Sequence, residues 1–113
     1  SLTTSCYNNM FAYCSNLKEV PELNAMVMGD TCYSNMFNSC TSLVKAPALP
    51  ATELNTYCYN NMFHMCHNLE IAPILPALTL KPNCYRQMFK GCAKIDYIKA
   101  MFLTEPGTSY TLN

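Results

Sequence analysis

Eight cysteines are the side chains of this sequence with the widest choice of chemistry. They form four pairs, each with seven residues between its members: Cys6 and Cys14, Cys32 and Cys40, Cys58 and Cys66, and Cys84 and Cys92. This spacing matches no zinc or redox motif. A cysteine nucleophile would need a base beside it in a cleft, and four copies of one catalytic residue have no chemical rationale. We therefore expect a protein that is not an enzyme.

Disulfide bonds are the usual role of many cysteines in a short chain. Here the regular spacing favours buried thiols. Stacked copies of a cysteine would form a column, and pairing within a column leaves one member over whenever the number of copies is odd. A thiol is also a good small core side chain. Buried thiols are the prediction, and disulfides remain the alternative.

His64-Met65-Cys66-His67 is the only local cluster of residue types that bind metals. Structural zinc sites usually pair ligands two to four residues apart, and do so twice. No second pair is present, and the positions that match the two histidines in other copies hold Ala12 and Ser15, Asn38 and Thr41, and Lys90 and Ala93. With three glycines in the chain there is no glycine-rich phosphate loop. We expect surface histidines, no metal and no cofactor.

A repeat positions these residues. The frame Cys-Tyr-x-x-Met-Phe-x-x-Cys begins at Cys6, Cys32, Cys58 and Cys84, each 26 residues after the last. A fixed period of 20 to 50 residues is typical of stacked repeat proteins, in which each unit contacts only its neighbours. We divide the chain, 1–113, as one solenoid fragment with units 6–31, 32–57, 58–83 and 84–109.

The first half of each unit has a helical pattern. In the third unit the apolar positions are Leu54, Cys58, Met62, Phe63 and Cys66, whose spacings of four, four, one and three fit one face of a helix. The pattern predicts a short helix of about three turns that ends near Cys66. The columns predicted to hold the structure together are Cys6, Cys32, Cys58 and Cys84; Cys14, Cys40, Cys66 and Cys92; and Phe11, Phe37, Phe63 and Phe89.

The second half of each unit cannot continue that helix, because Pro21, Pro47 and Pro73 recur in it. Proline also removes a donor from any sheet ladder, so these segments can pair for only part of their length. We expect a very short strand or extended run of about three to four residues in each unit. The predicted fold class is an α/β repeat solenoid, similar to leucine-rich repeats.

The ends of the chain depart from the frame. Leu2 corresponds to Met28, Leu54 and Leu80, so we expect the sequence to open inside the tail of a preceding unit of a longer protein. In the last unit Lys99 replaces the proline, Ile95 replaces the leucine, and Glu105-Pro106-Gly107-Thr108 interrupts the pattern. We expect this unit to act as a cap.

The charge pattern excludes two classes of partner. Only 12% of the residues are charged and the formal net charge is zero. Nucleic-acid binding needs a concentrated basic stripe, and the sequence has none. No stretch approaches the roughly 18 apolar residues that span a bilayer, and no basic amphipathic segment points to an anionic membrane. We expect neither nucleic-acid binding nor direct membrane insertion of this fragment.

With these residues laid out, the chain resembles the BspA-type leucine-rich repeats of bacterial surface proteins, as found in Bacteroides and its relatives. The resemblance depends on Met-Phe-x-x-Cys-x-x-Leu-x-x-Ala-Pro-x-Leu-Pro-Ala, complete at Met36–Ala51 and Met62–Ala77. It is degenerate at Met10–Ala25, where Val20 and Asn24 depart, and breaks after Ile98. The resemblance implies a leucine-rich-repeat solenoid on a secreted or surface-anchored protein, used in adhesion or protein binding, without catalytic residues. Cell-surface or extracellular localisation is implied only by this resemblance.

Binding specificity should lie at the positions that differ between copies, because the positions that recur are needed for the fold. The variable positions on the extended runs carry both charges and apolar side chains, which is typical of a protein-binding patch. The predicted binding residues are Lys18, Glu19, Glu22, Lys45, Glu70, Ile71, Ile74, Asp96 and Tyr97, with Val44, Ala48 and Ala100 beside them.

A column of tyrosines, Tyr7, Tyr33, Tyr59 and Tyr85, offers an alternative. Stacked aromatic rings could bind sugars, but a tyrosine recurring with the frame is more often partly buried packing. The leading hypothesis is a non-catalytic module that binds a protein of the host or of a bacterial surface. The alternatives are an architectural spacer in a larger surface or virion protein, and a carbohydrate-binding module.

Overall fold

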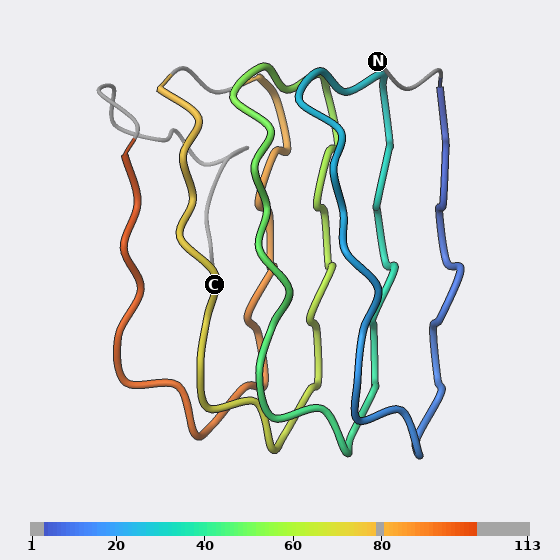
Figure 1. The fold of residues 1–113 in the computed structure, drawn as a ribbon, viewed down its shortest axis with the longest axis vertical. Coiled ribbons are helices and arrows are strands. Elements are labelled where there is room, and N and C mark those ends of the chain that lie inside the picture. Colours follow the sequence, from blue (N-terminus) through green and yellow to red (C-terminus); the bar gives the residue numbers. More distant parts are fainter. Residues whose placement is uncertain (1–3, 79–80, 102–113) are drawn as a thin grey trace.

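Two kinds of segment alternate along the chain in the computed structural model, which describes residues 4–78 and 81–101. The first kind, here called the turn segments, comprises residues 5–14, 31–40, 57–66 and 83–92. The second, called the extended runs, comprises residues 18–24, 44–50, 70–76 and 96–101. Within the described ranges neither kind contains an α-helix or a continuous strand. Figure 1 shows the extended runs in front and the turn segments behind them, with the copies of each kind side by side in chain order.

Each turn segment is a chain of overlapping tight turns. In the first, the Asn8 amide donates to the Ser5 carbonyl at 3.2 Å, and the Met10 amide donates to the Tyr7 carbonyl at 3.3 Å. The third residue of each of these turns, Tyr7 and Asn9, has a φ of 60°. Positive φ at that position alone is the mark of a type II turn. The next three units begin in the same way.

These turns stand where the sequence pattern predicted a helix. Residues 54–66 form no helix, although the expected side chains are inside: Leu54, Cys58, Met62, Phe63 and Cys66 are all buried. Tyr59 is fully buried as well. Buried pairs alternate with more accessible pairs, so the pattern has a period of four. A helix face with spacings of three and four produces the same pattern in the sequence. The two structures therefore could not be told apart by periodicity.

What distinguishes the turns is the backbone that they leave for a neighbour. A helix satisfies its own amides, whereas here every interface between units carries five backbone hydrogen bonds, four between turn segments and one to the residue just before a turn segment. At the first interface these run from the amides of Ser5, Asn9, Phe11 and Tyr13 to the carbonyls of Asp30, Ser34, Met36 and Asn38, and from the Tyr33 amide to the Cys6 carbonyl. The same five recur, 26 and 52 residues further on, at the other two interfaces.

This conformation is costly for most residues. Among residues 4–78 and 81–101, fifteen non-glycine residues have positive φ, and each costs about 1 kcal/mol or more in the left-handed region. Asparagine tolerates that region best after glycine, and Asn9, Asn35, Asn61 and Asn83 occupy it here. The interface hydrogen bonds and the burial of the columns must offset the remaining cost, so a single unit should not be stable alone.

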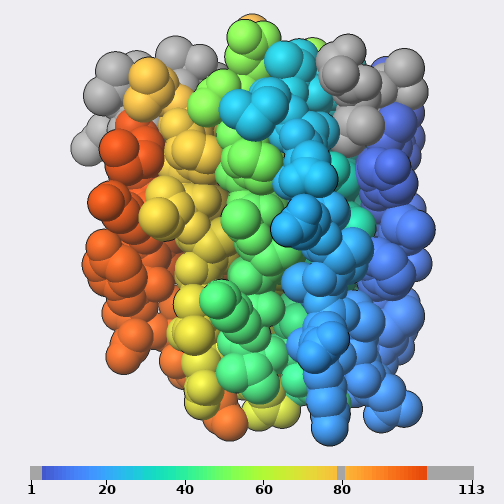
Figure 2. Space-filling model, viewed as in Figure 1, coloured from blue at the N-terminus to red at the C-terminus, as the bar shows by residue number. Residues whose placement is uncertain are grey.

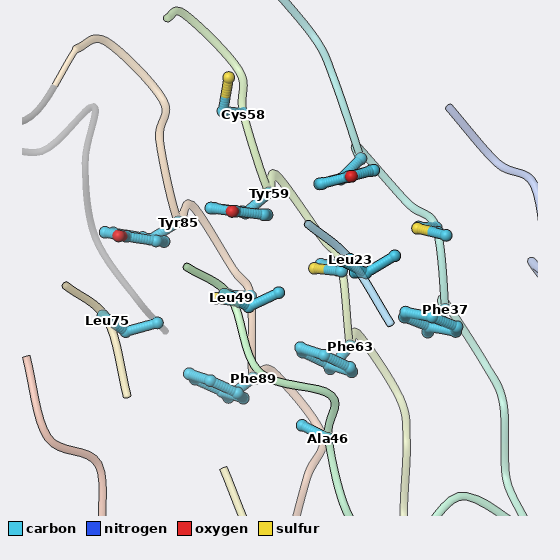
Figure 3. Close-up of a cluster of buried hydrophobic side chains, with 14 of the residues drawn as sticks. Leu23, Phe37, Ala46, Leu49, Cys58, Tyr59, Phe63, Leu75, Tyr85 and Phe89 are labelled. Carbon is cyan, nitrogen blue, oxygen red and sulfur yellow. The ribbon is translucent and has the colours of Figure 1, made fainter. Parts of the chain in front are cut away.

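The columns fill the space between the two layers. The rings of Phe11, Phe37, Phe63 and Phe89 stack with centroids 5.6, 5.6 and 5.9 Å apart and planes within 7°. In Figure 3 the labelled phenylalanines and tyrosines form two parallel rows, and Leu23, Leu49 and Leu75 of the extended runs form a third. All three leucines are buried in the same core as the rings. Stacking of identical side chains therefore provides the core.

The extended runs pair much less than the turn segments. In the described part of the chain, the predicted short strands are reduced to three isolated parallel β-bridges, Val27 with Glu53, Lys45 with Ile71, and Leu75 with Ala100. The first two join residues 26 apart, but the third joins residues 25 apart. The shift falls in the unit in which Lys99 replaces proline, and the Lys99 carbonyl accepts the Leu75 amide at 2.9 Å. Met101, which occupies the leucine position of the repeat, is 43% exposed as a result.

Two predictions concern ends of the chain that lie partly outside the described residues. Leu2, Leu80 and the expected cap residues Glu105 to Thr108 are not among them. Among residues 4–78 and 81–101, no helix has the length and apolar character needed to cross a membrane.

Candidate functional site

The cysteines link each unit to the one before it. All eight lie in described positions, and their side chains are thiols. In the second column, the thiols of Cys40, Cys66 and Cys92 donate to carbonyls 29 residues earlier, those of Phe11, Phe37 and Phe63, at 3.0 to 3.1 Å. In the first column, Cys58 and Cys84 bond in the same way to Gly29 and Asn55, at 3.1 and 2.8 Å. These positions need a side chain that is small enough for the core and that can donate a hydrogen bond to the preceding unit. Cysteine meets both needs.

Burial makes these thiols poor nucleophiles. It raises the pKa of Cys40 to about 11, of Cys66 to about 12 and of Cys92 to about 11. Only the thiolate attacks or binds metal, and at neutral pH these groups stay protonated. At the other column, the interaction of the two neighbouring thiols raises the pKa of Cys58 and lowers that of Cys84. Both side chains are fully buried, so no substrate reaches them in this structure.

The histidine cluster of the third unit does not converge. The Cys66 thiol points into the core, whereas the His67 ring lies at the surface with Nδ1 3.1 Å from the Gly91 carbonyl oxygen. Partial burial, helped by Lys90, lowers the pKa of His64. Within the described parts of the chain, no three His, Cys, Asp or Glu side chains are grouped so as to hold a metal ion.

The tyrosine column is packing rather than a platform. Tyr33, Tyr59 and Tyr85 are at most 3% exposed, and consecutive rings stack 5.6 to 5.8 Å apart. Tyr7 is 47% exposed, because in the described residues the first unit has a neighbour on one side only. A sugar could reach Tyr7 but not the other three rings.

The extended runs form the accessible variable face, which is the face seen in Figure 2. All nine predicted binding residues are exposed, as are Val44, Ala48 and Ala100. Apolar side chains are prominent on the second, third and fourth runs: Val44 is 44% exposed, Ile71 52%, Ile74 56% and Tyr97 70%. We call these four residues the apolar patch. Lys45, Glu70 and Asp96 are their charged neighbours in the sequence, and Lys45 forms a β-bridge with Ile71.

A groove lies at the other end of the same face, between the first and second extended runs. Its volume is about 700 Å³, and the predicted residues Lys18, Glu19, Glu22 and Lys45 contribute to its walls. The volume is in the range of ligand sites, which is roughly 300 to 1,000 Å³. The predicted binding residues thus fall into two groups, one around the groove and one around the apolar patch, and Lys45 belongs to both.

The repeat pattern does not single out the rest of the groove. Its walls also include Val20, Leu23, Asn24, Ala46 and three prolines, Pro21, Pro47 and Pro50. The available signal was the pair of departures from the frame at Val20 and Asn24, which mark the first run as different from the second. The depth between two runs depends on backbone pairing, and pairing cannot be read from the composition of the runs.

No family model, curated protein or solved structure matches this chain.

Proposed function

We propose that this chain is a non-catalytic binding module that holds a protein partner against its extended runs. The observation that carries the proposal is the apolar patch, in which four apolar side chains are 44 to 70% exposed beside charged neighbours. Exposed apolar residues cost solubility, and grouped among charges they are typical of protein-binding surfaces. The patch lies on positions that the repeat does not need for its core.

The resemblance of the repeated frame to BspA-type leucine-rich repeats supports a particular kind of parent protein and location. It favours a solenoid of a secreted or cell-surface bacterial protein, with adhesion to a host or bacterial protein as the role. The stacked coils and the 26-residue register of the columns support the repeat architecture. The turn segments replace the helices that we predicted for the first half of each unit. The proposal therefore concerns a repeat in which that half is made of turns.

The test compares two variants that remove similar side chains from opposite layers. Ile71→Ala with Tyr97→Ala removes half of the apolar patch, and Tyr57→Ala removes a tyrosine that is 42% exposed on a turn segment. Each protein is passed over immobilised purified extracellular-matrix proteins and over a glycan array. We expect a matrix protein to bind the native chain and the Tyr57 variant, and to bind the double variant at least tenfold more weakly.

Other outcomes have distinct meanings. Binding that survives the double variant would place the partner elsewhere and end the role proposed for the patch. Retention on glycans alone would favour the carbohydrate-binding alternative, with Tyr7 as the accessible ring. If neither surface retains the native chain, the architectural spacer becomes the better hypothesis. A fall of the thermal midpoint in the double variant would show that Ile71 and Tyr97 support the fold instead.

A further inference from the structure

The groove lies between the first two extended runs, which share no backbone hydrogen bond with each other, whereas each later pair of runs does. Between the second and third runs, the Ala46 amide donates to the Ile71 carbonyl at 3.0 Å and the Ile71 amide to the Val44 carbonyl at 3.2 Å. No backbone hydrogen bond joins residues 18–24 to residues 44–50, all of which the structure describes. Pairing of the first and second units on this face starts only at Met26 and Glu53.

A difference in sequence accompanies the open groove. The column that holds Ala46 and Ala72 begins with Val20, which packs partly buried against the core. The branched side chain is larger than alanine by two methyl groups, and Ile98 is the branched residue of the same column in the fourth run. Asn24 likewise stands where Pro50 and Pro76 follow the later runs. The first run is therefore the one built differently at the groove.

The walls of the groove offer more backbone acceptors than donors. Pro21, Pro47 and Pro50 have carbonyl oxygens but no amide hydrogen. A ligand that brings hydrogen-bond donors would match this surplus of acceptors. The amides of an extended polypeptide do so, and adding a strand to an open backbone edge is a common mode of peptide recognition.

The charges of the groove are also available. Glu19 and Lys45 occupy the same position of the repeat on opposite walls, and Lys18 and Glu22 lie close by along the first run. All four side chains are exposed, and none forms an ion pair with another residue of the described chain. A ligand with both acidic and basic side chains would meet both signs.

We propose that this groove seats an extended peptide segment of a protein partner, bonded through its backbone and carrying both acidic and basic side chains. The wall of residues 18–24 extends over about 23 Å at roughly 3.3 Å per residue, which accommodates about seven residues of peptide. This inference deepens the proposed function, since it assumes a protein partner, but it concerns a different end of the face from the apolar patch.

The test uses the full chain and an array of heptapeptides. The array is based on the sequence of residues 69–75, Leu-Glu-Ile-Ala-Pro-Ile-Leu, which already lies against the second run in this fold, with Glu and Lys placed at each position in turn. The best peptide is then measured by fluorescence anisotropy, alongside a copy that is N-methylated at alternate residues. We expect the N-methylated copy to bind at least tenfold more weakly, because it lacks half of its donors.

Variants of the chain locate the site. Lys45→Glu should weaken binding of the best peptide at least fivefold, because it reverses a charge of the groove. Ala48→Arg should weaken binding by as much, because the larger side chain fills the groove. Lys94→Glu makes the same charge change at an exposed position outside the groove and should leave the affinity within twofold. The thermal midpoints of the three variants should match that of the native chain, since all three side chains are exposed.

Three results would overturn the inference: no retained heptapeptide, equal affinity of the N-methylated copy, or equal losses for Lys45→Glu and Lys94→Glu. The proposed function is tested separately by the Ile71/Tyr97 double alanine variant. That variant should keep its heptapeptide affinity while losing the matrix protein. Loss of heptapeptide binding in it would show that the two ends of the face are not separate sites.

Discussion

The turn segments and the extended runs differ in how regularly they bond to the neighbouring unit. At each of the three interfaces, the turn segments form the same five backbone hydrogen bonds in the same register. The extended runs and the residues that follow them have two or three bonds at each interface, and their positions differ from one interface to the next. One layer is therefore repeated in detail, and the other is attached to it at irregular points.

The difference explains where the repeat can vary. In the turn segments the columns of cysteine, tyrosine, methionine and phenylalanine are occupied by packing, so their residue types recur. Along the extended runs only six of the 27 positions are buried, Leu23, Leu49 and Leu75 among them. The positions between them can change charge or size without loss of the core. Stability and recognition are thus assigned to different layers, and the following predictions test that division.

The largest effect should come from the phenylalanine column. Phe63 is fully buried between two rings whose centroids lie 5.6 and 5.9 Å away. Phe63→Ala should lower the free energy of unfolding by about 3–5 kcal/mol, the usual cost of removing a buried ring. Tyr97→Ala, at a position that is 70% exposed, should change it by less than about 0.5 kcal/mol. Urea denaturation measures both, and equal costs would contradict the division into layers.

Alkaline pH should weaken the turn segments next. The folded thiols of Cys40, Cys66 and Cys92 have pKa values raised to about 11, 12 and 11, whereas an unfolded chain has the ordinary value of about 8.5. A raised folded pKa gives stability that is complete below the unfolded pKa and is lost as pH rises toward the folded one. We expect the free energy of unfolding to fall from pH 8.5 toward pH 11, by up to about 1.4 kcal/mol per pH unit for each buried thiol.

The control for this pH dependence is within the same column. Cys66→Ala should make the fall less steep, because one buried thiol no longer titrates differently in the two states. Cys14→Ala, at an exposed position, should leave the steepness unchanged. Denaturation curves recorded between pH 8 and pH 10.5 decide the matter, and a flat profile in the native chain would exclude the thiols as the cause.

A smaller loss of stability is expected when alanine replaces the only glycine with positive φ in the described turn segments. Gly91 has a φ of 82°, and a β-carbon there would lie 2.5 Å from the sulfur and 3.2 Å from the α-carbon of Met65. Gly91→Ala should therefore cost about 1–2 kcal/mol, although glycine-to-alanine changes at ordinary φ often stabilise. The cost should shrink in a Met65→Ala background, since the sulfur is then absent. A cost that is the same in both backgrounds would assign it to φ alone.

The smallest predicted effect has the opposite sign. The Tyr59 hydroxyl is buried and has no hydrogen-bond partner in the described part of the structure. A buried polar group without a partner destabilises a fold, so Tyr59→Phe should raise the free energy of unfolding by about 1 kcal/mol. Tyr97→Phe, which removes the hydroxyl of an exposed tyrosine, should leave the free energy of unfolding unchanged. Loss of stability in Tyr59→Phe would show that the hydroxyl is satisfied after all.

The sequence by itself determined the units and the columns. A 26-residue period requires that identical positions meet when units stack, because the chain must close each coil in the same number of residues. Cys58, Met62, Phe63 and Cys66 could therefore be assigned to one buried set from the period and spacing. The same reasoning assigned Lys45, Ile71 and Tyr97 to the variable surface, since residues that differ between copies cannot form a uniform core.

Only the tertiary structure decided how the backbone closes each coil. Two buried residues followed by two accessible ones fit both a helix and a chain of type II turns. The turns prevail because their amides can bond to the next unit, and that gain exists only when neighbours are present. The groove was marked in the sequence only by the departures at Val20 and Asn24. Whether two runs pair depends on backbone contacts between units, which one unit alone does not contain.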